Sequence, residues 1–141
     1  MAAETDLERL LSGLNPTLVE GVYVFATLSA DRIPDGLRPL MVFREAEGTT
    51  LILSREEAAH RGIAYDFPCR MITLAVHSAL DAVGLVARMA TALADCGIPA
   101  NPVSGYYHDH LFVPLGREGE ALAVLQGLVD LSRQIESVTA E

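Results

Sequence analysis

The sequence predicts an α+β fold made of two similar halves, each an antiparallel sheet with helices on one face. Runs rich in β-branched and aromatic residues alternate with amphipathic segments along the chain. The 141 residues suffice for one ordinary domain or two very small ones, and two halves of about 70 residues would each be marginal alone. We therefore expect halves at 1–68 and 69–141 that share a core.

The first half opens with a short helix and a strand. A capping-box pattern at Thr5 and Glu8 predicts the start of the helix, and Asn15-Pro16 predicts its end. Residues 19–28 contain VYVFATL, which is typical of a strand buried on both faces for part of its length. The proline-containing segment 31–39 is predicted to be a loop.

A hairpin and a second short helix complete the first half. Residues 40–54, LMVFREAEGTTLILS, predict two strands that turn at Glu47 and Gly48. A second capping-box pattern, which starts at Ser54, predicts a short helix. Residues 63–70 form the expected joint between the halves, and their aromatic content argues against a flexible linker.

The second half is more regular. Apolar residues recur at three- and four-residue steps over 82–96 and 118–132, which predicts two amphipathic helices. A strand at 71–76 precedes the first helix, and a hairpin over 98–115 lies between the two. This order is that of a ferredoxin-like βαββαβ unit. The tail offers only a weak closing strand at 134–139, so the first half or a partner is an alternative source of that edge.

Charge and hydropathy exclude several classes of partner. The net charge is −9, and the basic residues are ten arginines spread from Arg9 to Arg133 instead of a cluster. Binding to the phosphates of nucleic acid or to an anionic membrane needs clustered cations, so we predict neither. No run approaches the roughly 18 apolar residues of a membrane span.

The N-terminal segment and the cysteines indicate a cytoplasmic protein. MAAETDLERLL carries acidic residues where a secretory signal would carry cations, so export is not expected. Cys69 and Cys96 form neither a CxxC pair nor a disulfide framework, and we interpret both as reduced core thiols. Half of the residues are hydrophobic and the mean hydropathy is +0.29, which favours a homodimer that covers part of the apolar surface.

The chain resembles the ACT domain family, specifically small bacterial proteins with two ACT-like units in tandem. The resemblance rests on GVYVFATL and LMVFREAEGTTLIL in the first half and on residues 71–115 in the second, including the turn at 81–84 and the hairpin segments 104–106 and 108–110. It implies a ferredoxin-like fold, domains that pair side by side, and regulatory binding of amino acids or related metabolites at the interface. The first half is atypical, because the loop at 31–39 replaces a helix.

The turn before the first helix of the second half is the candidate ligand site. We expect this helix to begin near Asp81, so the next three amides lack intrahelical acceptors and lie at the positive end of the helix dipole, where a ligand carboxylate is stabilised. Asp81, Ser104 or a strand carbonyl could accept a hydrogen bond from a ligand ammonium. The candidate ligand-binding residues are Ser78, Asp81, Ala82, Val83, Gly84, Leu85, Asn101, Ser104 and Tyr106.

A structural interpretation of the same turn stays open. Asp81 or Ser78 would then only cap the helix, and Gly84 would only let the helix pack closely on the sheet. Tyr106 and Tyr107 would lie one in the core and one at a dimer interface.

No motif for catalysis or for cofactor binding is present. GxSxG, P-loop and GxGxxG patterns and an acid pair of diagnostic spacing are missing from the sequence, so we expect no enzyme, no catalytic residues and no cofactor. His108 and His110 would share one face of a strand, with Asp109 or His77 nearby. No further ligand stands at a diagnostic separation, so we predict no metal site.

These inferences predict a non-catalytic regulatory protein that binds a small molecule, most simply an amino acid, and signals allosterically by shifting how its units pack. The alternative is a ligand-free module for protein–protein interaction built on ACT-like pairing.

Overall fold

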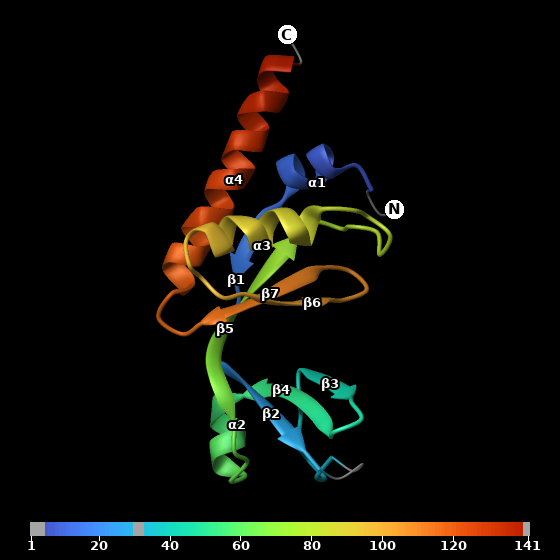
Figure 1. Cartoon of the computed structure of the whole chain (residues 1–141), viewed down its shortest axis with the longest axis vertical. Helices are drawn as coiled ribbons and strands as arrows, with labels where there is room; N and C mark the ends of the chain where they lie inside the picture. The colour runs from blue at the N-terminus through green and yellow to red at the C-terminus, as the bar shows by residue number, and fades with distance from the viewer. Residues whose placement is uncertain (1–4, 30–32, 140–141) are drawn as a thin grey trace. The chain divides into compact units, whose positions relative to one another are not determined.

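The computed structural model describes residues 5–29 and 33–139 (Figure 1), which fall in two compact units. Unit 1 combines the residues up to Val19 with those from Met71 onwards, and unit 2 is Glu20–Arg70. The halves expected at 1–68 and 69–141 differ from these units in the placement of the first 19 residues. The elements are α1 (Leu7–Gly13), β1 (Asn15–Leu18), β2 (Tyr23–Leu28), β3 (Met41–Arg44), β4 (Thr49–Ser54), α2 (Arg55–His60), β5 (Asp66–Ala75), α3 (Leu85–Asp95), β6 (Asn101–Ser104), β7 (Asp109–Pro114) and α4 (Glu118–Thr139).

Unit 1 has the strand order β1-β5-β7-β6. This is the ferredoxin-like order, with β1 in the place of the last strand of a βαββαβ unit. Buried residues of α1, α3, α4 and the sheet form one hydrophobic cluster, which includes Ile72 and Leu74 of β5 and Leu111 and Val113 of β7. These strand residues alternate along β5 and β7, so the helices cover one face of the sheet.

The closing strand of unit 1 comes from the first half of the chain. β1 pairs antiparallel with β5, from Asn15 opposite Ala75 to Leu18 opposite Ile72. The prediction of a weak strand at 134–139 is wrong, because these residues form the last part of α4. Of the two alternative sources that the sequence left for this edge, the first half is the one that the structure shows.

Unit 2 has the strand order β3-β4-β2-β5 and, among its described residues, the single helix α2. Its core contains Val24 and Ala26 of β2, Leu51 and Leu53 of β4 and Ala58 of α2. The described part of the connection between β2 and β3 is not helical, as the prolines there predict.

β5 contributes to both units, because its residues up to Arg70 belong to unit 2 and those from Met71 to unit 1. The joint expected at 63–70 therefore lies largely in a strand. Within unit 2 the register between β2 and β5 shifts between Tyr23 and Phe25. Opposite this shift Phe67 has a left-handed φ of 56°, which is typical of a local bulge.

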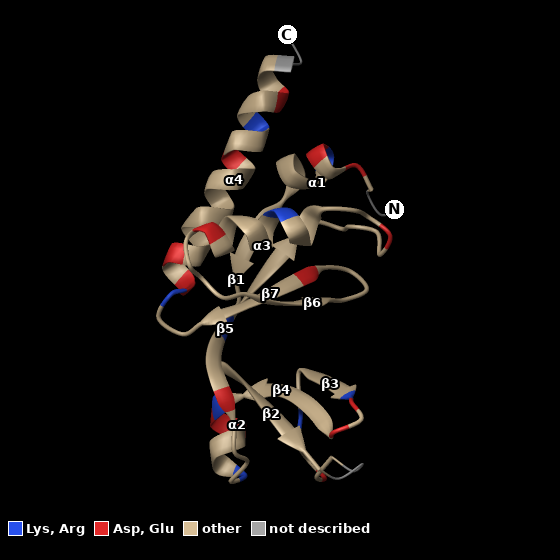
Figure 2. Cartoon of the chain, viewed as in Figure 1, with Lys and Arg blue, Asp and Glu red and all other residues tan. Residues whose placement is uncertain are grey.

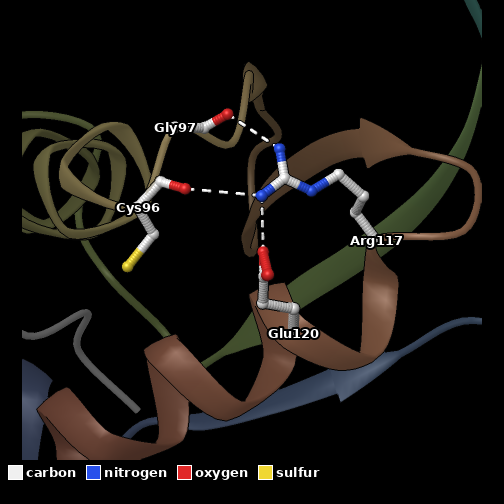
Figure 3. Close-up of polar contacts among 4 residues, drawn as sticks. All are labelled: Cys96, Gly97, Arg117 and Glu120. Atoms are coloured by element: carbon white, nitrogen blue, oxygen red, sulfur yellow. Dashed lines mark hydrogen bonds and ion pairs between the residues drawn. The ribbon is translucent and has the colours of Figure 1, made fainter.

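Arg117 joins the end of α3 to the start of α4 (Figure 3). Its guanidinium donates to the carbonyl oxygens of Gly97 at 2.8 Å and Cys96 at 3.4 Å and pairs with Glu120 at 2.5 Å. Carbonyls at a helix C-terminus lack intrahelical donors and attract cations, so Arg117 stabilises this end of α3 and orients α4.

The two cysteines have different environments, so the expectation of two core thiols is wrong for Cys96, which is exposed. Cys69 is fully buried and donates to the carbonyl oxygen of Tyr23 at 3.3 Å. Burial raises the pKa of the Cys69 thiol to about 12, which leaves almost no reactive thiolate near neutral pH.

We expect iodoacetamide to modify the native protein at Cys96 alone, because Cys96 is exposed and Cys69 is buried. The measurement is intact mass followed by peptide mapping, and modification after denaturation should reach both cysteines. Equal labelling of Cys69 in the native protein would contradict its burial.

Candidate ligand-binding site

A cavity of about 220 Å³ lies in unit 1, where the loop before α3, the first turn of α3 and the β6–β7 hairpin meet. Drug-sized ligands occupy pockets of about 300 Å³ or more, so this cavity suits a smaller metabolite. The residues that line it are Ser78, Leu80, Ala82, Gly84, Leu85, Val86, Ala87, Ser104, Gly105 and Asp109.

The helix that opens at the cavity begins later than the sequence indicates. α3 starts at Leu85, not near Asp81, and its N-cap is Gly84. The amide of Ala82 donates to the carbonyl of Ala79 at 3.0 Å, so it is not a free donor for a ligand. The expected start near Asp81, and with it the unpartnered amide of Ala82, is therefore wrong.

The first-turn amides of α3 are those of Leu85, Val86 and Ala87, and all three residues line the cavity. The first intrahelical hydrogen bond to the N-cap residue is donated by the amide of Arg88 to the carbonyl oxygen of Gly84, at 2.9 Å. The preceding amides have no intrahelical acceptor. The donor set predicted from the sequence thus exists three residues further along the chain.

Gly84 has a structural reason for lacking a side chain. Its φ is 102°, in the left-handed region, and a Cβ there would lie 3.2 Å from Leu7 Cδ2 of α1. As the N-cap residue it offers no side-chain hydrogen bond to the helix. The structural interpretation in which Asp81 or Ser78 caps α3 is therefore wrong. Gly84 lies close to a neighbouring element, but that element is α1 and not the sheet.

We expect Gly84→Ala to destabilise the protein by about 1–2 kcal/mol, because a Cβ disfavours this φ and presses on Leu7. The matched control is Gly127→Ala inside α4, where a Cβ meets nothing within 4 Å. That change should stabilise by roughly 0.5–1 kcal/mol. Urea unfolding of both variants measures the difference, and equal effects would contradict the strain at Gly84.

The acceptor side of the cavity is Asp109, at the start of β7. The register places Asp109 opposite Ser104 of β6, and the hydroxyl of Ser78 donates to its Oδ2 at 3.5 Å. From the sequence, we expected the acceptor to be Asp81, Ser104 or a strand carbonyl, and Asp109 was not among the predicted ligand-binding residues. The alternation along β7 is a signal that could have identified Asp109, because this residue falls on the same face of the strand as the core residues Leu111 and Val113.

The structure brings several predicted site residues together and leaves others apart. Ser78, Ala82, Gly84, Leu85 and Ser104 line the cavity. The remaining candidates, Asp81, Val83, Asn101 and Tyr106, are not among the lining residues. Val83 and Tyr106 have exposed fractions of 81% and 73%, and Asn101 pairs with Phe112 at the far end of the hairpin from Ser104.

The histidines near the hairpin contact protein groups. Nδ1 of His108 lies 3.2 Å from the carbonyl oxygen of Val76, and Nδ1 of His110 lies 3.0 Å from Oγ1 of Thr73. In the part of the chain that the structure describes, no three His, Cys, Asp or Glu residues are placed to hold a metal ion. Burial lowers the pKa of His110 from its usual 6.5, His108 lowers it further, and Asp109 partly opposes them.

The low pKa of His110 gives the stability a pH dependence. In the unfolded chain this side chain takes up a proton near pH 6.5, whereas the folded protein keeps it neutral to lower pH, so the free energy of unfolding decreases as the pH falls below about 6.5. When the pH is lowered from about 7.5 to 5.5, we expect the free energy of unfolding of His110→Gln to decrease less than that of the native sequence. Urea titrations at each pH measure this difference. Identical pH profiles would show that His110 is not held neutral.

The charged residues are spread over the described part of the chain. Figure 2 shows the arginines of each unit distributed over several elements and connections, with acidic residues among them. No helix in 5–29 or 33–139 is long and apolar enough to cross a bilayer.

Comparison with known proteins matches most of the chain. Two ACT domain family models match in tandem, one over residues 2–70 and one over residues 66–127. No curated protein matches the chain. A crystal structure of a Vibrio cholerae protein of unknown function, described as a possible transport protein, is 44% identical, with a TM-score of 0.79. The match covers 87% of this chain and 95% of that one.

More distant structures share the fold. An Agrobacterium tumefaciens protein is 21% identical, with a TM-score of 0.70 and coverage of 82% of this chain and 89% of that one. A structure of the aspartokinase alpha and beta subunits is 12% identical, with a TM-score of 0.60 and coverage of 82% and 97%. The chain therefore belongs to the ACT domain family of regulatory, small-ligand-binding modules and carries two such domains in tandem.

Proposed function

We propose that this protein binds a free amino acid in the cavity at the first turn of α3 and acts as a non-catalytic regulator. The proposal is supported by one observation: Leu85, Val86 and Ala87, the residues of the first turn of α3, line the same cavity of about 220 Å³ as Asp109. The amides and the helix dipole stabilise a ligand carboxylate. Asp109 accepts hydrogen bonds from a ligand ammonium.

The lining also favours some side chains of the ligand over others. None of the described residues that line the cavity is basic, and Asp109 is the acidic one. A ligand with an acidic side chain would bring a second carboxylate without a cation to pair with it. Leu80, Leu85 and Val86 offer apolar contacts. We therefore favour amino acids with neutral or basic side chains.

Regulation follows from the differential affinity of the ligand for two arrangements of the assembled protein. We include a homodimer in the proposal, because half of the residues are hydrophobic and such surface is commonly covered by a second subunit. We also place the protein in the cytoplasm, since Cys69 and Cys96 are unpaired thiols and reducing compartments preserve them.

A ligand-free interaction module is the second candidate. It is favoured by the edge strand β3, where Val42 and Phe43 have exposed fractions of 40% and 62%. An apolar edge strand can add to the sheet of another chain. Under this candidate the cavity would have no physiological occupant.

A thermal-shift screen against the twenty amino acids and common purine and pyrimidine metabolites separates the two candidates. A ligand at 100 times its dissociation constant adds about 2.7 kcal/mol to the stability, which raises the midpoint by several degrees. We expect a neutral or basic amino acid to produce this shift. If no compound moves the midpoint while the dimer persists at low concentration, the interaction module is the correct function.

The same screen repeated on Asp109→Asn tests the place of binding. We expect this variant to weaken the responding amino acid at least about tenfold, because the ammonium loses its charged acceptor. The matched control is Asp95→Asn, at the exposed end of α3, which should leave the affinity unchanged. An undiminished response of Asp109→Asn would place the ligand elsewhere.

A further inference from the structure

Helix α4 carries an apolar stripe besides the one that it buries in unit 1. The buried residues Ala121, Leu125 and Val129 belong to the core. With 100° per residue, a further row lies roughly a quarter turn away around the helix. That row, which we call the α4 stripe, is Leu128, Leu131, Ile135 and Val138.

The α4 stripe is exposed over most of its length. Leu131, Ile135 and Val138 have exposed fractions of 53%, 56% and 75%, and Leu128 is partly buried against the core. Figure 1 shows that this part of α4 extends past α1 within unit 1. Isolated apolar residues on a surface need no explanation, but a row on one helix face marks a contact surface.

The spacing within the stripe is that of a helix-pairing seam. Its residues follow one another at steps of three, four and three, which are the a and d positions of a heptad. The unit-1 face of α4 is already fixed by its own packing. From Leu131 onwards the stripe lies on an exposed face of α4, where it can contact another helix.

Hydrogen bonds within the single chain order the part of α4 that carries the stripe. Arg133 donates to the carbonyl oxygens of Ser12 at 2.8 Å and Leu14 at 3.1 Å. Around the helix, the buried face of α4 lies between Arg133 and the stripe. Gln126 donates to Asp130 one turn apart at 3.0 Å. A surface ordered in advance loses less conformational entropy on binding.

We propose that the α4 stripe pairs with the same stripe of a second copy of this chain. The charges favour this occupant. The chain carries −9, so two copies repel one another over most of their surface, yet the stripe and its flanking residues Gly127 and Gln134 are uncharged. A basic partner helix would require acidic flanks, and an anionic membrane would require basic ones. Figure 2 shows the charged residues of this end of α4.

The extent of the stripe sets the strength of the contact. Three helical turns on each side bury less than the roughly 800 Å² per partner of a standard interface. The pairing is therefore a concentration-dependent equilibrium, with a dissociation constant expected in the micromolar range. This inference rests on the homodimer of the proposed function and assigns one of its interfaces.

The test is sedimentation velocity of the full chain over a range of concentrations. Leu131→Glu with Ile135→Glu places like charges across the seam and should raise the dissociation constant more than about tenfold. The matched control is Ala123→Glu with Ser137→Glu, which adds the same charges to exposed positions of the same helix outside the stripe. Its dissociation constant should stay near that of the native sequence.

A second variant keeps the test decisive if the double glutamate variant unfolds. Val138→Leu enlarges the most exposed residue of the stripe and should lower the dissociation constant several-fold. A native dimer that all three variants leave unchanged would overturn the α4 pairing and leave the homodimer intact. A native chain that is monomeric at every concentration would overturn both, and a thermal-shift response to an amino acid would still report on the ligand site.

Discussion

The pairing of β1 with β5 is the interaction on which the rest of unit 1 depends. A βαββα segment leaves the first strand of its sheet open on one side, and β1 covers it from Asn15 to Leu18. The same short segment carries α1, whose Leu7 packs at Gly84 and whose last carbonyls accept hydrogen bonds from Arg133. Residues 7–18 thereby contact both the start of α3 and the outer half of α4.

This arrangement accounts for the chemistry of the candidate site. Leu7 and the left-handed Gly84 set where α3 begins, and this fixes which amides open onto the cavity. The hairpin register places Asp109 opposite Ser104, and both residues line the same cavity as the first turn of α3. The positive end of the helix dipole and a carboxylate then border one small volume, which complements a zwitterion.

Much of the fold could be predicted from local patterns, and the failures have physical causes. The strands, hairpins and amphipathic helices have strong periodicity and were found. β1 was missed because Asn15-Pro16 looks like a helix stop, and only its tertiary pairing makes it a strand. The start of α3 was placed too early because propensity does not reveal the backbone conformation of Gly84. Asp109 was missed as an acceptor because its position depends on a hairpin register that sequence alone leaves open.

The most direct test of the ligand site follows individual backbone amides in a ¹H–¹⁵N correlation spectrum during titration with the amino acid that stabilises the protein. We expect Leu85, Val86 and Ala87 to show the largest chemical-shift changes, with their amide protons moving downfield as they form hydrogen bonds to the ligand carboxylate. Unchanged signals for these residues, with the shifts concentrated on elements that do not line the cavity, would contradict it.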